Sequence, residues 1–247
     1  MLRIISLAFA MLIIVAAVPV QPVHSAPAVV QAPSTQFLSG TGPCVWQISQ
    51  PVRSGDTVVG FAHMTQHSDA AEAYQQSVTD NAGNQYNLTA GVHWAPYSED
   101  IGMWYLTDVQ GNPTTFYFNF PDGTTGLICN VGLVEYSGAT TVNAVAGPIA
   151  TASSPLPLLT ILPTTSSLIW AFGATNSVDD GSDLLTPGYS LLINNQRTDG
   201  LAVWGSNSPV REDVLIWSNP YWNATICADG TQTSTGCSTV MIAAAIN

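Results

Sequence analysis

The alternation of apolar and polar positions is clearest at residues 113–138, where it predicts two strands joined by a turn. In the first strand, Tyr117 and Asn119 separate three residues on the opposite face, Phe116, Phe118 and Phe120. A period of two residues is typical of a half-buried strand, because successive side chains point to opposite faces. Pro121-Asp122-Gly123 predicts the turn. Residues Leu127 to Tyr136 are largely apolar on both faces, which predicts a central strand.

Short strand patterns continue along the chain at a spacing of roughly ten residues. Residues 77–80 and 85–89 flank the turn-forming sequence Asn81-Ala82-Gly83-Asn84, which predicts a hairpin. Only residues 63–75 have a helical composition, and Asp69 to Ala73 could form one or two turns capped by Ser68. Many short strands with almost no helix predict an all-β fold, a two-sheet β-sandwich. The other predicted strands are 44–52, 57–62, 92–94, 101–107, 142–150, 155–162, 167–174, 189–194, 201–205, 214–217 and 238–247.

Residues 1–25 predict an export signal peptide. Arg3 precedes an almost wholly apolar run from Ile4 to Val18, and Val23-His24-Ser25 supplies small residues at the −3 and −1 positions of a cleavage site. An uncleaved anchor helix is the alternative, although the apolar run is short for a membrane span. Residues 26–40 are small, contain proline and lack periodicity, so we expect a flexible N-terminal linker. We expect residues 41–247 to form a single β-sandwich domain.

The composition is acidic, with a net charge of −12 from 16 acidic and four basic residues. Lysine is absent, and removal of the signal peptide leaves only Arg53, Arg197 and Arg211. Nucleic acids and anionic membrane surfaces are poor partners for such a chain, because both bind clustered lysine and arginine. A lysine-free composition rich in small polar residues suits an exported protein that must stay soluble. We therefore expect a secreted or cell-surface location, with no membrane insertion after signal cleavage.

The four cysteines predict two disulfides, because an even number in an exported chain is typically paired. Of the three possible pairings, we favour Cys227 with Cys237, which closes a small loop, and Cys44 with Cys129, which ties the N-terminal segment to the central strand. A zinc site made from all four thiolates is the alternative, but the chain has no CxxC motif.

Several segments together resemble a β-sandwich domain that is widespread in secreted and surface-exposed bacterial proteins. The most specific of them are the hairpin SVTDNAGNQYNLT and the strand end Glu135-Tyr136-Ser137-Gly138, within a similarity that covers residues 54–247. The resemblance implies a jelly-roll-like or immunoglobulin-like sandwich that often occurs near surface, adhesive or carbohydrate-related modules, and it supplies no catalytic residues. The cysteines and the aromatic-bearing segment from Trp217 to Cys237 depart from that pattern, which leaves open a specialised loop.

Glu135 is the candidate catalytic residue. In a regular strand it shares a face with Cys129, Val131 and Leu133, so a carboxylate lies in register with an apolar stripe. One interpretation is an acid or nucleophile with a raised pKa. The other is a structural carboxylate at a strand end, bonded to backbone amides or to an arginine. Glycoside hydrolysis would need a second carboxylate across a cleft, for which the available residues are Glu99, Asp100, Asp108 and Asp213.

Two further patterns contain metal-ligating residue types. His63 and His67 are four residues apart, with Asp69, Glu72 and His93 nearby, but the glutamate of a zinc-binding H-E-x-x-H motif is missing. We interpret these histidines as exposed loop residues. The acidic loop that contains Asp179, Asp180 and Asp183 could bind calcium, although it lacks the EF-hand spacing. We therefore expect no cofactor other than this possible calcium ion.

Aromatic residues give the best indication of a ligand. The candidates are Trp94, Tyr97, Tyr221 and Trp222, because the aromatic pairs of this chain cannot all enter one core. Tyr221 and Trp222 lie among polar residues and adjoin the expected Cys227–Cys237 loop. Rings exposed beside Asn and Asp suit stacking on sugars, whereas packing under long loops is the structural alternative. We expect a binding module for a glycan or cell-wall polysaccharide. A glycoside-active enzyme that uses Glu135, or a structural or adhesive protein, remains the alternative.

Overall fold

The computed structural model describes residues 26–41, 43–65, 77–94, 99–119, 125–151, 158–175, 186–195, 200–216 and 239–247. In these residues the regular elements are all strands, and no helix there is long and apolar enough to cross a membrane. The signal peptide and the short helix expected at Asp69 to Ala73 lie outside them. The strands are β1 (Ala28–Gln31), β2 (Ser34–Thr41), β3 (Cys44–Gln47), β4 (Thr57–Thr65), β5 (Ser77–Asp80), β6 (Gln85–Trp94), β7 (Glu99–Leu106), β8 (Thr115–Asn119), β9 (Thr125–Ser137), β10 (Val142–Thr151), β11 (Leu158–Ile161), β12 (Leu168–Thr175), β13 (Tyr189–Asn195), β14 (Gly200–Ser206), β15 (Asp213–Ile216) and β16 (Thr239–Ile246).

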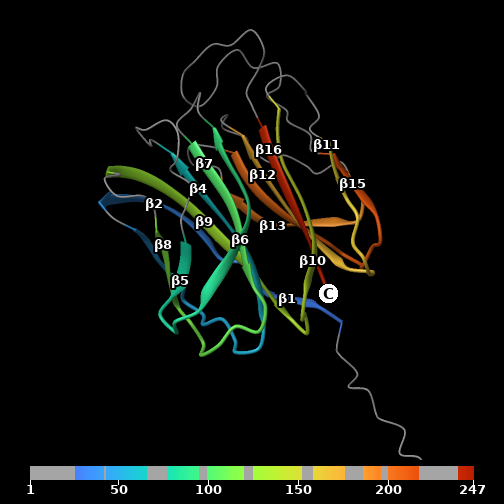
Figure 1. Ribbon diagram of the computed structural model, residues 1–247, viewed down its shortest axis with the longest axis horizontal. Helices are drawn as coiled ribbons and strands as arrows, with labels where there is room; N and C mark the ends of the chain where they lie inside the picture. The colour runs from blue at the N-terminus through green and yellow to red at the C-terminus, as the bar shows by residue number, and fades with distance from the viewer. Residues whose placement is uncertain are drawn as a thin grey trace, which may run out of the picture.

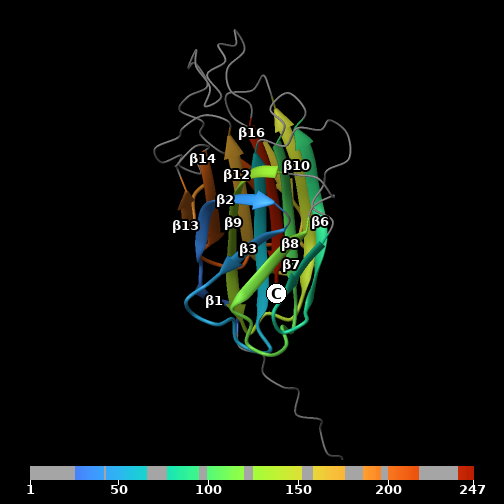
Figure 2. The ribbon, with the colours of Figure 1, turned by 90° about the vertical axis from the view of Figure 1, so that its left-hand side faces the viewer.

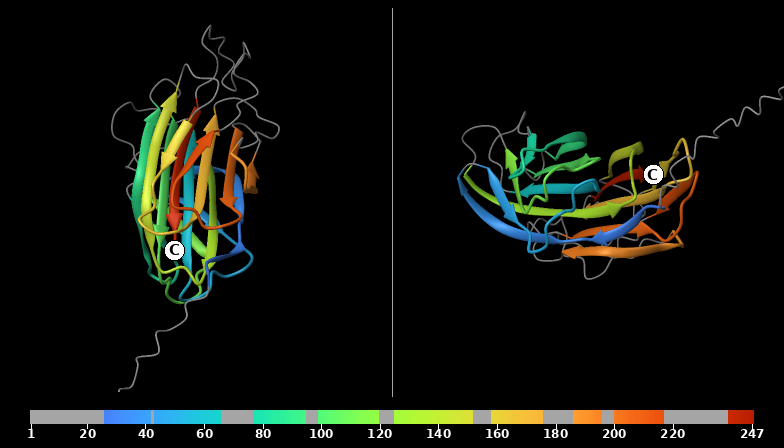
Figure 3. Two further views of the ribbon diagram at one scale, coloured as in Figure 1. Left: turned by 90° about the vertical axis from the view of Figure 1, so that its right-hand side faces the viewer. Right: turned by 90° about the horizontal axis from the view of Figure 1, so that it is seen from below.

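Two antiparallel sheets form a sandwich, as the sequence predicts (Figure 1). The first sheet has nine strands in the order β1-β9-β4-β7-β6-β5-β8-β3, and β2 also pairs with β9. The second has five strands in the order β10-β16-β12-β14-β13. The two sheets face each other along their length, with the yellow-to-red strands of the second sheet side by side in Figure 3. The all-β sandwich is therefore confirmed.

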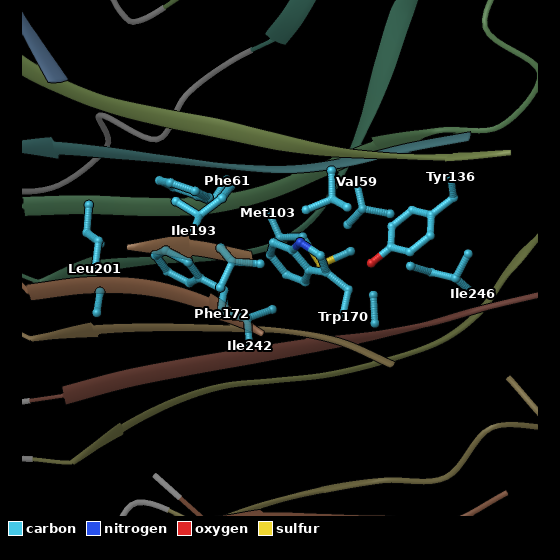
Figure 4. Packing of buried hydrophobic residues seen from close by; sticks show 14 of the residues in the cluster. Val59, Phe61, Met103, Tyr136, Trp170, Phe172, Ile193, Leu201, Ile242 and Ile246 are labelled. Carbon is cyan, nitrogen blue, oxygen red and sulfur yellow. The ribbon is translucent and has the colours of Figure 1, made fainter. Parts of the chain in front are cut away.

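The main core lies between the two sheets. Phe61 of β4 stacks on Phe172 of β12, with ring centroids 4.7 Å apart, and Trp170 and Tyr136 extend this cluster along the sandwich (Figure 4). All four side chains are essentially inaccessible to solvent. Burial of such large apolar surfaces is the main favourable contribution to folding.

The nine-stranded sheet folds back on itself and encloses a second core. Figure 2 shows β3 and β8 crossing in front of the long strands of the same sheet. Trp104 of β7 lies in this second core, with its ring centroid 5.0 Å from that of Tyr86 and 5.8 Å from that of Phe118. The Cys44–Cys129 disulfide joins β3, at one end of the strand order, to β9 near the other. The expected Cys44–Cys129 pairing is confirmed, and it excludes a zinc site made from four thiolates.

A third apolar cluster covers the outer face of the five-stranded sheet. The separate pair β11–β15 supplies Leu159, Ile161 and Leu215, which pack with Ala243 and other residues of the central strands. Both faces of β12 and β16 are therefore buried. This explains why SLIWAFGA and TVMIAAAI are apolar without alternation.

The structure corrects the prediction for the segment 26–40. This segment is not a linker, because β1 and β2 both pair antiparallel with β9. The residues lack hydrophobic alternation because β1 is a short, largely exposed edge strand, with Val29 43% exposed. Its position depends on backbone pairing, which a hydrophobic pattern does not report.

The structure also changes how the two strands at residues 113–138 relate to each other. Phe116 and Phe118 are buried on one face of β8, and β9 is a central strand, as predicted. However, β8 pairs with β3 and β5, whereas β9 pairs with β1, β2 and β4. The two strands therefore belong to different layers and do not form a hairpin.

Replacing Gly60 with alanine is expected to lower the free energy of unfolding by about 2 kcal/mol, because the added methyl group overpacks the second core. A Cβ atom at Gly60 would lie 2.3 Å from Cζ2 of Trp104 and 2.6 Å from the carbonyl oxygen of Gly132. Urea unfolding of Gly60→Ala, Trp104→Phe and the double variant tests this contact. Phenylalanine lacks the overlapping ring atoms, so the double variant should lose clearly less stability than the two single losses added together. Strict additivity would contradict the prediction.

Candidate functional site

Glu135 lies near the end of β9 and is completely buried. It shares the inward face of the strand with Val131 and Leu133, as the sequence predicts, and its cross-strand neighbour in β4 is Val58. At this position β9 pairs with β4 on one side and with β1 on the other. The carboxyl group of Glu135 therefore lies at one end of the second core, between these two strands. We call this end of the sandwich the Glu135 end.

Both oxygens of Glu135 accept hydrogen bonds. The backbone N–H of Arg53 donates to Oε1 at 2.8 Å, and Nε2 of Gln31 donates to Oε2 at 2.5 Å. The same Gln31 amide approaches the carbonyl oxygens of Gln50 and Pro51, each at 3.3 Å. This arrangement agrees with the interpretation of Glu135 as a structural carboxylate bonded to a backbone amide.

A second carboxyl group, that of Asp56, lies beside Glu135. Asp56 immediately precedes β4 and is 9% exposed, and its Oδ2 atom has no hydrogen-bond donor in the described part of the chain. The pKa of Asp56 is raised from 3.8 to about 6, first by burial and then by the hydrogen bond to Glu135 and the charge of Glu135, while the charge of Arg53 lowers it. When it carries a proton, the carboxyl group of Asp56 can act as a donor to Glu135.

The sequence did not identify Asp56 as the second carboxylate. Glu99 and Asp100 begin β7 at the end opposite Glu135, since Asp100 pairs with Met64. Asp108 is exposed, and Asp213 in the outer strand β15 accepts a hydrogen bond from Tyr189 at 2.8 Å. Asp56 lies two residues before Val58 and therefore on the same face of the chain. This spacing could have identified Asp56 only if Val58 was already known to pair with Glu135.

The carboxyl pair is closed to substrate. Pairs of carboxyl groups that share a proton serve acid–base catalysis where a cleft admits the substrate. Here Glu135 has no exposed surface and both of its oxygens already bind protein donors. The geometry therefore favours a structural role for Glu135.

Of the aromatic candidates, Trp94 lies in the described residues, at the end of the sandwich opposite Glu135. Trp94 is the last residue of β6, and its backbone pairs with Glu99 at the start of β7. Tyr97, Tyr221 and Trp222 lie outside the described residues, as do Cys227 and Cys237. We call this end of the sandwich the Trp94 end; it is formed by the strand-terminal residues Thr65, Trp94, Glu99, Thr175, Gly200 and Thr239.

His63 is not an exposed loop residue, which corrects the interpretation made from the sequence. It lies within β4, is 1% exposed, and its Nδ1 atom is 3.4 Å from Nδ2 of its cross-strand neighbour Asn130. The pattern failed here because β4 continues to Thr65, three residues beyond the apolar run. His67 lies outside the described residues.

The described ranges contain no group of three or more His, Cys, Asp or Glu side chains that could hold a metal ion. The possible calcium ligands Asp179, Asp180 and Asp183 lie outside those ranges. The calcium interpretation therefore stays a prediction.

Comparisons of the chain with protein-family models, curated proteins and solved structures found no match. The resemblance to the bacterial surface domain consequently rests on the motif residues themselves. Of these, the SVTDNAGNQYNLT hairpin forms β5 and β6 as predicted, with Val78 opposite Tyr86. Glu135-Tyr136-Ser137 ends β9.

Proposed function

We propose that this protein is an exported binding module for a glycan, such as a cell-wall polysaccharide, and that its ligand contacts the Trp94 end. Support comes from where the aromatic-bearing segments join the fold. Residues 95–98 connect Trp94 to Glu99, and residues 217–238 connect Ile216 to Thr239. The ligand candidates Tyr97, Tyr221 and Trp222 belong to these two segments.

The two sheets contribute to the Trp94 end together. Thr175 pairs with both Gly200 and Thr239, so three strands of the second sheet terminate at the same level. In the main core, Phe61 and Leu201 lie toward one end, and Tyr136 and Ile246 toward the other (Figure 4). Thr65 ends β4 beyond Phe61, and Gly200 begins β14 just before Leu201. The connecting segments of both sheets therefore join the strands at the same end of the sandwich.

The Glu135 end is occupied by hydrogen bonds within the protein. Asp80, Asn84 and Gln110 bond to one another there, and Glu135 binds Arg53 and Gln31. Polar groups that are already paired gain little from a new ligand. The Glu135 end therefore offers few free polar groups to a ligand, which favours placing the ligand at the Trp94 end.

Sugar binding fits the residue types of the segments at the Trp94 end. Flat aromatic rings present an apolar face to the C–H side of a sugar ring, while neighbouring amides and carboxylates bind its hydroxyl groups. Residues 217–238 combine Tyr221 and Trp222 with Asn219, Asn223 and Asp229.

The first experiment is depletion of the mature protein, residues 26–247, from solution by insoluble polysaccharides. We expect retention that falls about tenfold in Trp222→Ala, which corresponds to the loss of one stacking contact worth roughly 1.4 kcal/mol. Tyr117→Ala is the matched control, because Tyr117 is a partly exposed aromatic residue on the outer face of β8. It should leave retention unchanged.

The outcomes separate the alternatives. Loss of retention with a chelator would assign a calcium ion to the Asp179–Asp183 loop. Equal loss in Trp222→Ala and Tyr117→Ala would contradict a site at the Trp94 end. No retention on any polysaccharide would overturn the glycan proposal and favour a structural or protein-binding role.

A further inference from the structure

We propose that Asp56 and Glu135 form a proton-sharing latch that holds β1 and the turn at residues 49–56 against β9 in acid and loosens as the pH rises. The latch does not depend on the proposed glycan binding, and it lies at the other end of the sandwich.

Three segments meet at the carboxyl group of Glu135. The edge strand β1 reaches it through Gln31 and the turn through the backbone N–H of Arg53. The start of β4 reaches it through the buried Asp56, which lies two residues before Val58, the cross-strand partner of Glu135, and so on the same face. The Gln31 amide also bonds to Gln50 and Pro51 of the turn. A change at this one carboxyl group therefore acts on β1 and on the turn together.

Few apolar contacts hold β1 in place. It has four residues, pairs with β9 alone among the described strands, and changes register between Val29 and Gln31. Val29 is 43% exposed, and Ala28 is also exposed. Elements with little buried apolar surface open locally at a low free-energy cost. The polar contacts of Gln31 consequently add to the backbone pairing with β9 in holding β1.

Two charged groups act on Asp56: Glu135 from β9 and Arg53 from the turn. Arg53 is exposed, so solvent screens its favourable charge, whereas Glu135 is fully buried. When Asp56 loses its proton, two carboxylates face each other and Oδ2 of Asp56 has no donor. Water must then enter, or the segments must separate.

The sign of the pH dependence follows from the direction of the shift. The folded-state pKa of Asp56, about 6, is above the ordinary value of 3.8, so the folded protein binds this proton more tightly than the unfolded chain does. The stabilisation is complete below about pH 4 and is lost as the pH rises through about 6. The latch is therefore closed in acid and loosened at neutral pH.

Amide hydrogen exchange of the mature protein tests the latch. The measured quantity is the protection factor of the Arg53 amide, corrected for intrinsic exchange, at about pH 5 and pH 8. We expect it to fall about tenfold in the wild-type protein, because pH 5 lies about one unit below the folded-state pKa of about 6 and above the ordinary value of 3.8. In Asp56→Asn, whose amide donates to Glu135 at every pH, it should change by less than about twofold. The amide of Asn84, which donates to Asp80, is the internal reference for global unfolding.

Other results would overturn the latch. One is an Arg53 protection factor that is independent of pH in the wild type, and another is an equal fall in Asp56→Asn. If Asp56→Asn does not fold, NMR titration of the side-chain carboxyl carbon of Asp56 in the wild type decides, and a midpoint below about 5 contradicts a shared proton. Recovery of protection at pH 8 with about 5 mM calcium would show that a cation, and not a proton, closes the pair.

Discussion

Replacing Cys44 and Cys129 together with alanine is expected to lower the free energy of unfolding by about 4 kcal/mol, because the unfolded chain regains the entropy that the bridge removes. The two residues are 85 apart in the sequence, so the bridge closes a long loop. It also fastens β3 to β9 and so keeps the folded-back half of the nine-stranded sheet over the second core. Urea denaturation of the double variant and the wild type measures the loss.

Reduction provides the control that separates the bridge from its packing. Both sulfur atoms are fully buried, and Sγ of Cys44 lies 3.8 Å from Sδ of Met64. The reduced wild type keeps these packing atoms, so it should be less stable than the oxidised protein but more stable than the double alanine variant. A loss of less than about 1 kcal/mol in the double variant would contradict the assigned role of the bridge.

Local patterns predicted the strands well, because alternation follows directly from burial of one face. Phe116 and Phe118 report the inward face of β8, and the turn at Asn81-Ala82-Gly83-Asn84 joins β5 to β6. The length of β9 and its apolar character on both faces agree with its central place. In each case the information lies within a few consecutive residues.

The partners of each strand could not be predicted in the same way. A turn after β8 is compatible with a hairpin, yet β8 joins a different layer from β9. Similarly, β1 depends on backbone pairing, and Asp56 comes beside Glu135 only through the β4–β9 register. These features are set by contacts between residues that are distant in the sequence, which short-range patterns do not contain. The buried carboxyl pair was therefore half predicted, with Glu135 found and Asp56 missed.

Asp80 organises the hairpin that the sequence identified most specifically. Its Oδ1 atom accepts the backbone N–H groups of Ala82 and Asn84, at 2.9 and 3.0 Å. Its Oδ2 atom accepts the Asn84 side-chain amide at 2.7 Å and the Tyr86 hydroxyl at 2.8 Å. Burial and then the Asp80 carboxylate hold the pKa of Tyr86 above its ordinary value, so the hydroxyl group remains a donor.

Asp80→Ala is accordingly expected to lower the free energy of unfolding by about 3–4 kcal/mol, because four donors lose a charged acceptor and two of the residues involved, Asn84 and Tyr86, are buried. Asp80→Asn should cost less than the alanine variant, since one carbonyl oxygen still serves the backbone donors. Tyr86→Phe, which removes one of the four bonds, should cost about 1 kcal/mol. Urea unfolding of the three variants gives the order directly. If Asp80→Ala costs no more than Tyr86→Phe, the carboxylate does not organise the turn, and the specificity of this motif must come from its backbone conformation, including the positive φ of 88° at Gly83.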